Sequence, residues 1–168
     1  MNKLFLLIEK AKHSPFYLKL LNVLLLRRIP FNRPHGLKIT AVNENGFTVF
    51  LPYKRKNLNH LHGIHACALG ALAEYTAGIT LLYKLHSEEY RLIMKNIAVV
   101  FHFQAKADVS AECAVTEKWI DEKIITPLQN TESAFVEMNI EIFDVARNHI
   151  CTTTVNWQVK KWNAVKTS

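Results

Sequence analysis

The sequence predicts an α+β fold in which an antiparallel sheet wraps around one long hydrophobic helix. Residues 63–83 are apolar or small on every side of a helix, with Glu74 as the only charge, and a helix without a polar face is normally buried. On both sides of this stretch, segments that alternate apolar and polar residues are joined by turn-forming residues, which is typical of β-hairpins. Strands joined by hairpins, together with a single hydrophobic helix, imply a sheet that covers this helix.

Two helices are expected before the sheet. Residues 2–12 predict the first, and the second has Ser14 as its N-cap and Pro15 at its first position. The second helix should end near Arg28, because prolines follow it. Its apolar run, residues 16–26, is too short and too polar to be a membrane span, which needs about 20 apolar residues. The segment also lacks the apolar core and cleavage site of a signal peptide.

This helical segment, residues 1–35, precedes a main domain that is expected over residues 36–163. The elements of the main domain, in order, are a hairpin over 37–52, a basic loop over 53–62, the long helix from about 64 to about 86, and strands over 97–108, 109–120, 132–146 and 149–162. The first two of these long strands are expected to pair in a hairpin that turns at residues 107–110. The last two are expected to turn at residues 144–149.

Length and composition limit the class of protein. The 168 residues fit one domain, and a hydrophobic content of 49% argues against disorder. The three cysteines, Cys67, Cys113 and Cys151, are widely spaced and include no CxxC pair. Neither a disulfide framework nor a cysteine zinc site is therefore expected, and a reducing cytoplasm is the expected location.

The positive charge is concentrated at the N-terminus. Of the formal net charge of +7, most belongs to residues 1–36, where Glu9 is the only acid against seven bases: Lys3, Lys10, Lys12, Lys19, Arg27, Arg28 and Arg33. The nearly neutral remainder argues against a nucleic-acid-binding face. Two interpretations stay open, a solvated basic helix face and attraction to anionic lipid or to an acidic carrier protein. The second predicts peripheral membrane contact through residues 1–33.

Glu74 is the first candidate for a catalytic group. At helical spacing its neighbours are small, among them Gly70, Ala71, Ala77 and Gly78. Another chain segment can therefore approach this face closely. Carboxylates are rarely buried unless they are paired or functional. A structural ion pair with a lysine or arginine is the alternative.

A motif around the start of this helix resembles that of hotdog-fold thioesterases of the phenylacetyl-CoA type. Residues 59–68 read NHLHGIHACA, so Asn59 precedes His65 by six residues and Glu74 follows it by nine. The chain looks most like the branch of this superfamily that is known as a domain of unknown function, in which His-Ala replaces His-Gly. Ala66 and Cys67 stand where the family has glycines, and His62 and Gly63 are also displaced from its pattern.

The resemblance implies a hotdog fold and a homodimer, with a tetramer as a further possibility. It also implies catalytic roles for Glu74, Asn59, His65 and Ala66. Amides of about residues 65–67, at the positive end of the helix, suit a developing oxyanion, and Glu74 suits a general base or a nucleophile. Nine helical residues span about 14 Å, so Glu74 cannot reach a carbonyl at the start of its own helix. The site should therefore be shared across a twofold dimer.

The expected activity is hydrolysis of an acyl-CoA or acyl-carrier-protein thioester, without a cofactor or metal. Lys54, Arg55 and Lys56 are candidates for the coenzyme A phosphates, and Gly63 and Gly70 for the substrate channel. His60, His62 and His65 lack nearby carboxylate or cysteine ligands, so a zinc site is not expected.

Other interpretations stay open at this point. The chain is alternatively a non-catalytic acyl- or lipid-binding protein that uses the same tunnel, or another hotdog lyase such as a dehydratase. Asn59 alternatively satisfies its own loop or caps the helix, and His65 alternatively serves as a cap or a hydrogen-bonded structural group.

Overall fold

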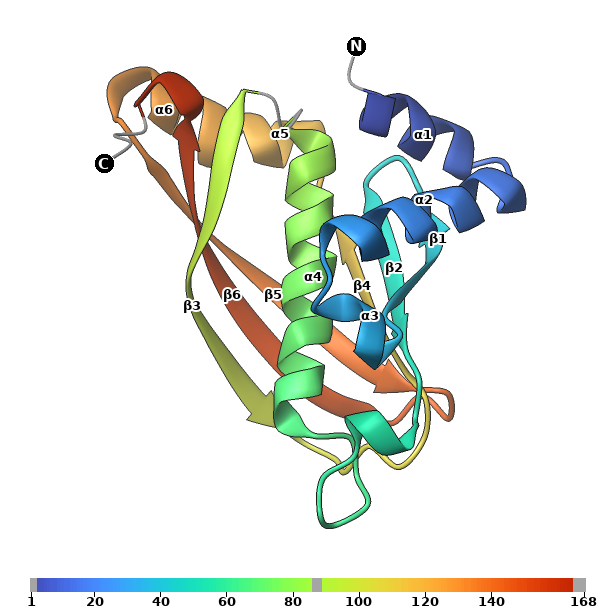
Figure 1. Cartoon of the computed structure of the whole chain (residues 1–168). Coiled ribbons are helices and arrows are strands. Elements are labelled where there is room, and N and C mark those ends of the chain that lie inside the picture. Colours follow the sequence, from blue (N-terminus) through green and yellow to red (C-terminus); the bar gives the residue numbers. More distant parts are fainter. Residues whose placement is uncertain (1–2, 86–88, 165–168) are drawn as a thin grey trace.

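The structure, a computed structural model, describes residues 3–85 and 89–164. Six antiparallel strands form one sheet in the order β1-β2-β4-β5-β6-β3. Its strands are β1 (Lys38–Val42), β2 (Gly46–Leu51), β3 (Tyr90–Phe101), β4 (Val109–Ala114), β5 (Ala134–Asp144) and β6 (His149–Lys161). The sheet curves around the long helix α4 (Ala66–Lys84), as Figure 1 shows, and this confirms the predicted α+β architecture.

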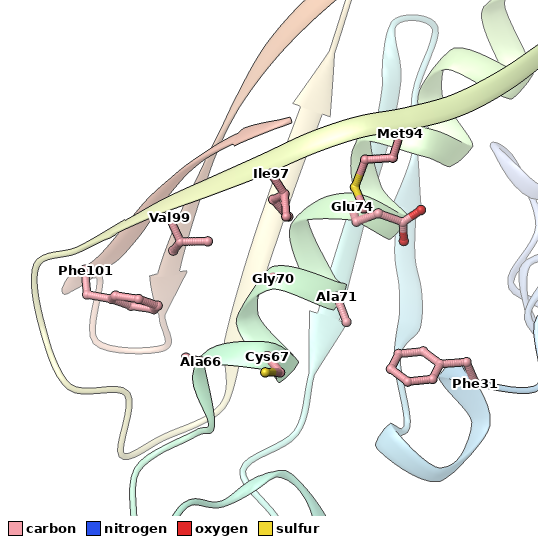
Figure 2. A pocket seen from close by; sticks show the side chains of 10 residues that line it. All are labelled: Phe31, Ala66, Cys67, Gly70, Ala71, Glu74, Met94, Ile97, Val99 and Phe101. Carbon is pink, nitrogen blue, oxygen red and sulfur yellow. The ribbon is translucent and has the colours of Figure 1, made fainter. Parts of the chain in front are cut away.

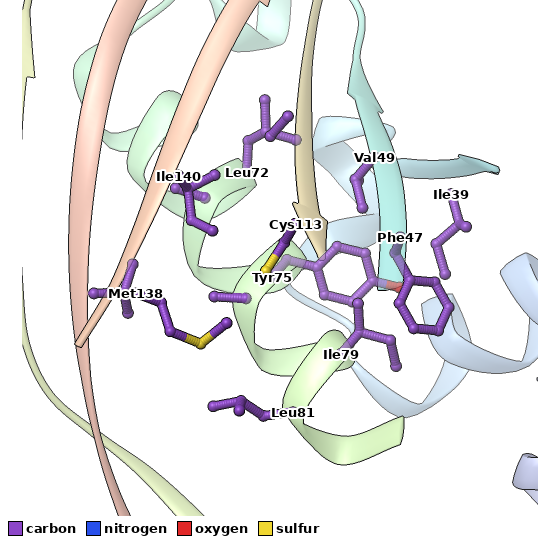
Figure 3. Close-up of a cluster of buried hydrophobic side chains, with 14 of the residues drawn as sticks. Ile39, Phe47, Val49, Leu72, Tyr75, Ile79, Leu81, Cys113, Met138 and Ile140 are labelled. Carbon is purple, nitrogen blue, oxygen red and sulfur yellow. The ribbon is translucent and has the colours of Figure 1, made fainter. Parts of the chain in front are cut away.

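The core lies between α4 and the concave face of the sheet. Side chains of α4 such as Leu72, Ile79 and Leu81 meet side chains of the strands such as Met138 and Ile140 (Figure 3). The alternation predicted for β5 and β6 is confirmed, because every second residue of each strand is buried. Length and composition alone would let α4 cross a membrane, but here the sheet buries most of the helix.

The N-terminal helices pack onto this domain. α1 (Lys3–Ala11) and α2 (Pro15–Arg28) confirm the two predicted helices, although the Ser14 side chain makes no capping hydrogen bond. Leu21 and Leu25 of α2 are buried in the common core. The Asn22 side chain accepts a hydrogen bond from the Ile39 amide (2.8 Å) and donates one to the Ile39 carbonyl (2.9 Å). α2 therefore covers the outer edge of β1, which would otherwise be an unpaired sheet edge.

Two short helical turns shape the region before α4. The helix α3 (Asn32–His35), which the sequence analysis did not predict, ends at Gly36 in a left-handed conformation (φ 72°). The 3₁₀ turn η1 (Arg55–Asn57) lies within the loop predicted over residues 53–62 and packs against α3.

The hairpin predicted to turn at residues 107–110 is wrong. β3 pairs with β6 at one edge of the sheet, whereas β4 pairs with β2 and β5 near its middle. β3 also begins at Tyr90 and ends at Phe101, rather than spanning 97–108. Apolar alternation indicates that a segment is a strand, but it carries no information about which strand is its partner.

The strand predicted over residues 109–120 is too long. β4 ends at Ala114, and a helical region follows: α5 (Glu117–Ile120), the π-helical turn η2 (Asp121–Ile125) and α6 (Pro127–Asn130). Thr116 begins this region, because its side chain accepts a hydrogen bond from the Trp119 amide. Ile120, Ile124 and Leu128 are buried at a spacing of four residues, which is a helical period. A last 3₁₀ turn, η3 (Trp162–Ala164), follows β6.

Candidate functional site

The first turn of α4 presents one unused backbone donor. His65 is the N-cap, and its Nδ1 accepts a hydrogen bond from the Cys67 amide (3.1 Å). The His65 amide donates to the Asn57 carbonyl (2.7 Å), and the Ala68 amide donates to the His65 carbonyl (2.9 Å). Of the three amides expected to bind an oxyanion, at residues 65–67, only that of Ala66 has no acceptor within the described part of the chain. It lies at the positive end of the helix dipole.

Asn59 shapes the loop that leads into α4. Its Oδ1 accepts hydrogen bonds from the backbone amides of Leu61 (2.9 Å) and Gly63 (3.1 Å). The backbone amide of Asn59 donates to the Gly63 carbonyl (2.9 Å). These contacts fit the alternative interpretation, in which Asn59 satisfies the hydrogen bonds of its own loop. Asn59 and Ala66 nevertheless line the same cavity of about 420 Å³, together with Phe101 of β3.

Gly63 is buried in this loop. A Cβ on Gly63 would lie 3.0 Å from the exposed Gln104 side chain, so the loop lies close to the segment after β3. The substrate-binding role of Gly63 stays a prediction.

Glu74 lies halfway along α4 in an apolar cavity of about 540 Å³ (Figure 2). The floor is the small-residue face of α4, one wall is β3, and Phe31 lies at the opposite side; the lining residues are Phe31, Ala66, Cys67, Gly70, Ala71, Glu74, Met94, Ile97, Val99 and Phe101. Gly70 and Glu74 thus line the same cavity, and the contact of Gly70 with substrate stays a prediction.

The Glu74 carboxylate has no hydrogen bond or ion pair with any residue that the structure describes. The structural ion pair considered as an alternative is thus not present in residues 3–85 and 89–164. Burial raises the pKa of Glu74 above its usual value. An unpaired carboxylate with a raised pKa in an apolar cavity is a stronger base than an exposed one, and such groups are candidates for catalysis.

The same face of the molecule exposes apolar surface. β3 is the unpaired edge of the described sheet, and four of its large apolar side chains are exposed: Ile93, Met94, Val100 and Phe101. Gly70 and Ala71, on the adjacent face of α4, are only half-buried. An exposed apolar patch beside an unpaired strand is typical of a surface that another chain covers.

A basic cavity lies between α3 and η1. Lys54, Arg55 and Lys56 line a hollow of about 580 Å³ together with Arg33 and Pro34 of α3. None of these four cations forms an ion pair with a residue of the described chain. The sequence analysis found the three residues in η1 and the loop before it but missed Arg33, because only the fold brings α3 against η1.

Among the described residues, no group of three histidine, cysteine, aspartate or glutamate side chains is close enough to share a metal ion. His65 uses its Nδ1 as a helix cap, as one of the two open interpretations held.

Three comparisons place the chain among known proteins. A family model described as a domain of unknown function, DUF4442, matches residues 18–159. The comparison with curated proteins gave no match. The chain is similar to a Pseudomonas aeruginosa protein of unknown function described as a probable thioesterase, with 22% identity and a TM-score of 0.77 over 91% of this chain and 95% of that one.

Two other solved structures extend the likeness. A Chlorobaculum tepidum protein of unknown function has 13% identity and a TM-score of 0.73 over 90% of this chain and 99% of that one. A mutant of a Staphylococcus aureus thioesterase has 12% identity and a TM-score of 0.60 over 78% of this chain and 98% of that one. Identities this low establish the fold alone, and the fold is the hotdog fold that the motif predicted. Because the family model covers most of the sequence, the chain belongs to the DUF4442 family of hotdog-fold proteins.

Proposed function

We propose that the protein hydrolyses an acyl thioester at a site shared by two subunits. The observation that carries this proposal is the Glu74 carboxylate, which is largely buried in an apolar cavity without a partner among the described residues. Burying such a group costs free energy, so a sequence retains it where its basicity is used. The thioesterase names of similar folds support the same reaction class.

The second subunit is needed because one helix separates the two halves of the site. The Ala66 amide and Glu74 are on the same helix, and eight residues of helix correspond to about 12 Å. A twofold partner whose α4 runs antiparallel would bring its own Ala66 amide to Glu74. The half-buried Gly70 and Ala71 permit the close crossing that this requires, and the exposed edge of β3 supplies further surface for the same contact.

The proposed reaction needs no cofactor. Glu74 of one subunit takes a proton from water, and the water oxygen attacks the carbonyl carbon of the thioester. The Ala66 amide of the partner subunit donates a hydrogen bond to the oxyanion that forms. The carbon–sulfur bond then breaks, and the leaving thiolate takes the proton back from Glu74. The products are a carboxylic acid and a free thiol. Direct attack by the carboxylate, through an anhydride that water then hydrolyses, has the same balance.

The basic cavity supports coenzyme A as the carrier. Its four cations, Arg33, Lys54, Arg55 and Lys56, surround a hollow with room for several phosphate oxygens. Arginine and lysine bind phosphate groups by charge-assisted hydrogen bonds. An acyl-carrier protein would instead present acidic side chains to the same surface.

The test is thiol release from a panel of short, medium, long and aromatic acyl-CoAs. Glu74→Gln keeps the shape of the side chain and removes the base, so we expect turnover to fall by about 10²–10⁴-fold. Glu112→Gln is the matched control, because Glu112 is an exposed residue of β4 and should leave turnover unchanged.

Two results would contradict the proposal. Equal turnover by the wild type and Glu74→Gln would remove Glu74 from the chemistry. No turnover by either protein, with acyl-CoA still bound, would identify a non-catalytic acyl-binding protein instead.

A further inference from the structure

A second cavity extends the site beyond Glu74 toward the C-terminal end of α4. It has a volume of about 640 Å³, and its lining includes Glu74, Gly78 and Leu82. Together with Gly70 of the first cavity, these residues recur at every fourth position and so share one face of the helix. The two cavities therefore follow one another along α4, and Glu74 lies where they meet.

The second cavity is roofed by the N-terminal helices and has an apolar lining. Leu4 of α1 and Leu25 of α2 lie in its wall. Besides Glu74, its charged lining residues are Arg28, which is exposed, and Arg91, which is half-buried, so these cations lie where the cavity meets water. The other lining residues are aliphatic, aromatic or glycine. Such a lining suits a hydrocarbon chain, and the volume lies within the range of about 300–1,000 Å³ that is typical of ligand pockets.

Gly78 keeps the path open just past Glu74. A Cβ at position 78 would lie 3.2 Å from Cη2 of Trp157 and 3.8 Å from Glu74 Oε1. A larger side chain would therefore occupy the space between the edge of the indole ring and the carboxylate. The glycine leaves this space to a slender group, such as an unbranched chain.

The carrier part of the substrate is expected on the other side of Glu74. Phe31 lines the first cavity, and Arg33, two residues later, lines the basic cavity proposed for the coenzyme A phosphates. The acyl chain and the thiol carrier leave a thioester carbonyl in opposite directions. A carrier bound toward Arg33 therefore leaves the second cavity to the acyl chain.

We infer that the substrate is a medium-length thioester whose unbranched, apolar acyl chain runs from Glu74 along α4 and ends beside Leu82, under the N-terminal helices. The eight helical residues from Glu74 to Leu82 span about 12 Å. A carbon–carbon bond of about 1.5 Å advances an extended chain by about 1.3 Å, so this distance corresponds to about nine carbons beyond the carbonyl. The inference rests on the proposed function, because Glu74 sets the position of the carbonyl.

The test measures binding, so that it does not depend on turnover. Full-length Glu74→Gln protein is titrated calorimetrically with saturated acyl-CoAs from butanoyl-CoA to hexadecanoyl-CoA. Each methylene that enters the apolar cavity should strengthen binding about fourfold. We expect this gain to stop at a chain of about ten carbons, where the cavity ends. A chain of that length that ends in a carboxylate should bind more weakly than its methyl-ended counterpart, because its charge would lose water.

Two variants of Leu82, made in the Glu74→Gln protein, assign the length limit to the end of the cavity. Leu82 is half-buried and lines the cavity, so Leu82→Phe should move the limit to shorter chains and Leu82→Ala should move it to longer ones. Both should bind butanoyl-CoA with unchanged affinity, because this chain is too short to reach Leu82. Leu20→Phe is the matched control, since Leu20 is exposed on α2 and lines none of these cavities.

The outcomes separate this inference from the proposed function. Three results would overturn the acyl path and leave the hydrolase proposal standing: affinity that does not rise with chain length, a limit that the Leu82 variants do not move, or tighter binding of the carboxylate-ended chain. A limit that moves with Leu82, in a protein whose wild type releases no thiol from any acyl-CoA, would overturn the hydrolase and retain the inferred ligand class.

Discussion

Glu74 combines two properties that are unfavourable for folding alone. It is largely buried, and no described residue forms an ion pair or hydrogen bond with it. Functional sites often keep such groups at the expense of stability. The unpaired state also leaves both carboxylate oxygens available to water or to a carbonyl carbon, which a structural ion pair would prevent.

The raised pKa of Glu74 predicts where activity is lost at low pH. Burial disfavours the ionised form, so the carboxylate is deprotonated only above a pKa that exceeds the ordinary value of 4.5. The base must be ionised to accept a proton, so kcat/KM should fall as the pH decreases through this raised value. A pH profile of thiol release, measured over a range in which the fold is intact by circular dichroism, checks this. An acidic limb at or below pH 4.5 would contradict it.

His65 is predicted to act as a helix cap rather than as an acid or base. His65→Ala removes the acceptor for the Cys67 amide and should lower the free energy of unfolding by about 1 kcal/mol. His65→Asn supplies another side-chain acceptor at the N-cap and should restore most of this stability. Urea unfolding measures both changes. A stable His65→Asn variant with wild-type thiol release fits the capping role, whereas a stable but inactive one would mean that the imidazole takes part in the chemistry.

The sequence predicts the candidate residues of the site better than their roles. Glu74 is recognisable because a single charge stands in an apolar helix, and Asn59 and His65 are candidates because their spacing to it resembles the motif of hotdog thioesterases. Their hydrogen bonds depend on the loop conformation, which local patterns do not determine. In the sequence, Trp157 looks like any other inward residue of a strand. Its ring lies beside Gly78 of α4 only because the fold brings these two distant segments together.

At the scale of elements, β3 shows why a pattern can be recognised and still be misplaced. Residues 97–100 alternate between half-buried and exposed as expected, but the register of β3 against β6 shifts between Met94 and Asn96, which interrupts the alternation before residue 97. The start of β3 at Tyr90 was therefore missed. The partner of β3 could not be predicted. The long helix before β3 can carry the chain to either edge of the sheet, and the same apolar alternation fits both positions.

The exposed face of α2 predicts contact with an anionic membrane surface. Phe16, Leu20 and Val23 are 70%, 45% and 42% exposed and recur at helical spacing, with Lys19 beside them. Apolar side chains flanked by cations favour binding at an anionic interface. The double variant Phe16→Ser/Leu20→Ser should therefore lose binding to vesicles that contain anionic lipid, as measured by co-sedimentation.

Point variants are needed here because α2 is part of the core. Deleting the segment would expose the buried partners of Leu21 and Leu25 and should destabilise the domain. Val145→Ser is the matched control, since Val145 is also 70% exposed but lies in the turn between β5 and β6. If the wild-type protein stays in the supernatant with anionic vesicles, the predicted membrane contact is wrong and the basic face of α2 is a solvated surface.

At the scale of the whole molecule, the two halves of the proposed site lie too far apart on α4 to act within one subunit. The exposed edge of β3 and the small residues of α4 lie on the same side as Glu74 (Figure 2). If the Ala66 amide and Glu74 serve one reaction, the rise per residue of the helix separates them too far to act within one subunit, and this is the reason for proposing a dimer. The exposed apolar surface is a physical reason for a second subunit to bind at this face, as the proposal requires.

A proline at position 66 isolates the amide half of the site. Ala66 is the first helical residue, where proline is favoured, and His65 has the extended conformation (φ −65°, ψ 140°) that a following proline requires. Ala66→Pro should therefore fold normally while lacking the N–H that has no acceptor among the described residues. Loss of an oxyanion donor lowers kcat by about 10²–10³-fold. Ala66→Ser keeps the N–H and serves as the control.

Mixing two inactive variants tests whether each site draws on both subunits. In a dimer of one Glu74→Gln subunit and one Ala66→Pro subunit, one site carries both defects and the other is intact. Random reassortment after refolding makes half of the dimers mixed, so thiol release should recover to about one quarter of the wild-type rate. Each variant refolded alone should stay inactive. If the mixture also stays inactive although native mass spectrometry shows mixed dimers, then both groups act within one subunit, and the shared site is wrong.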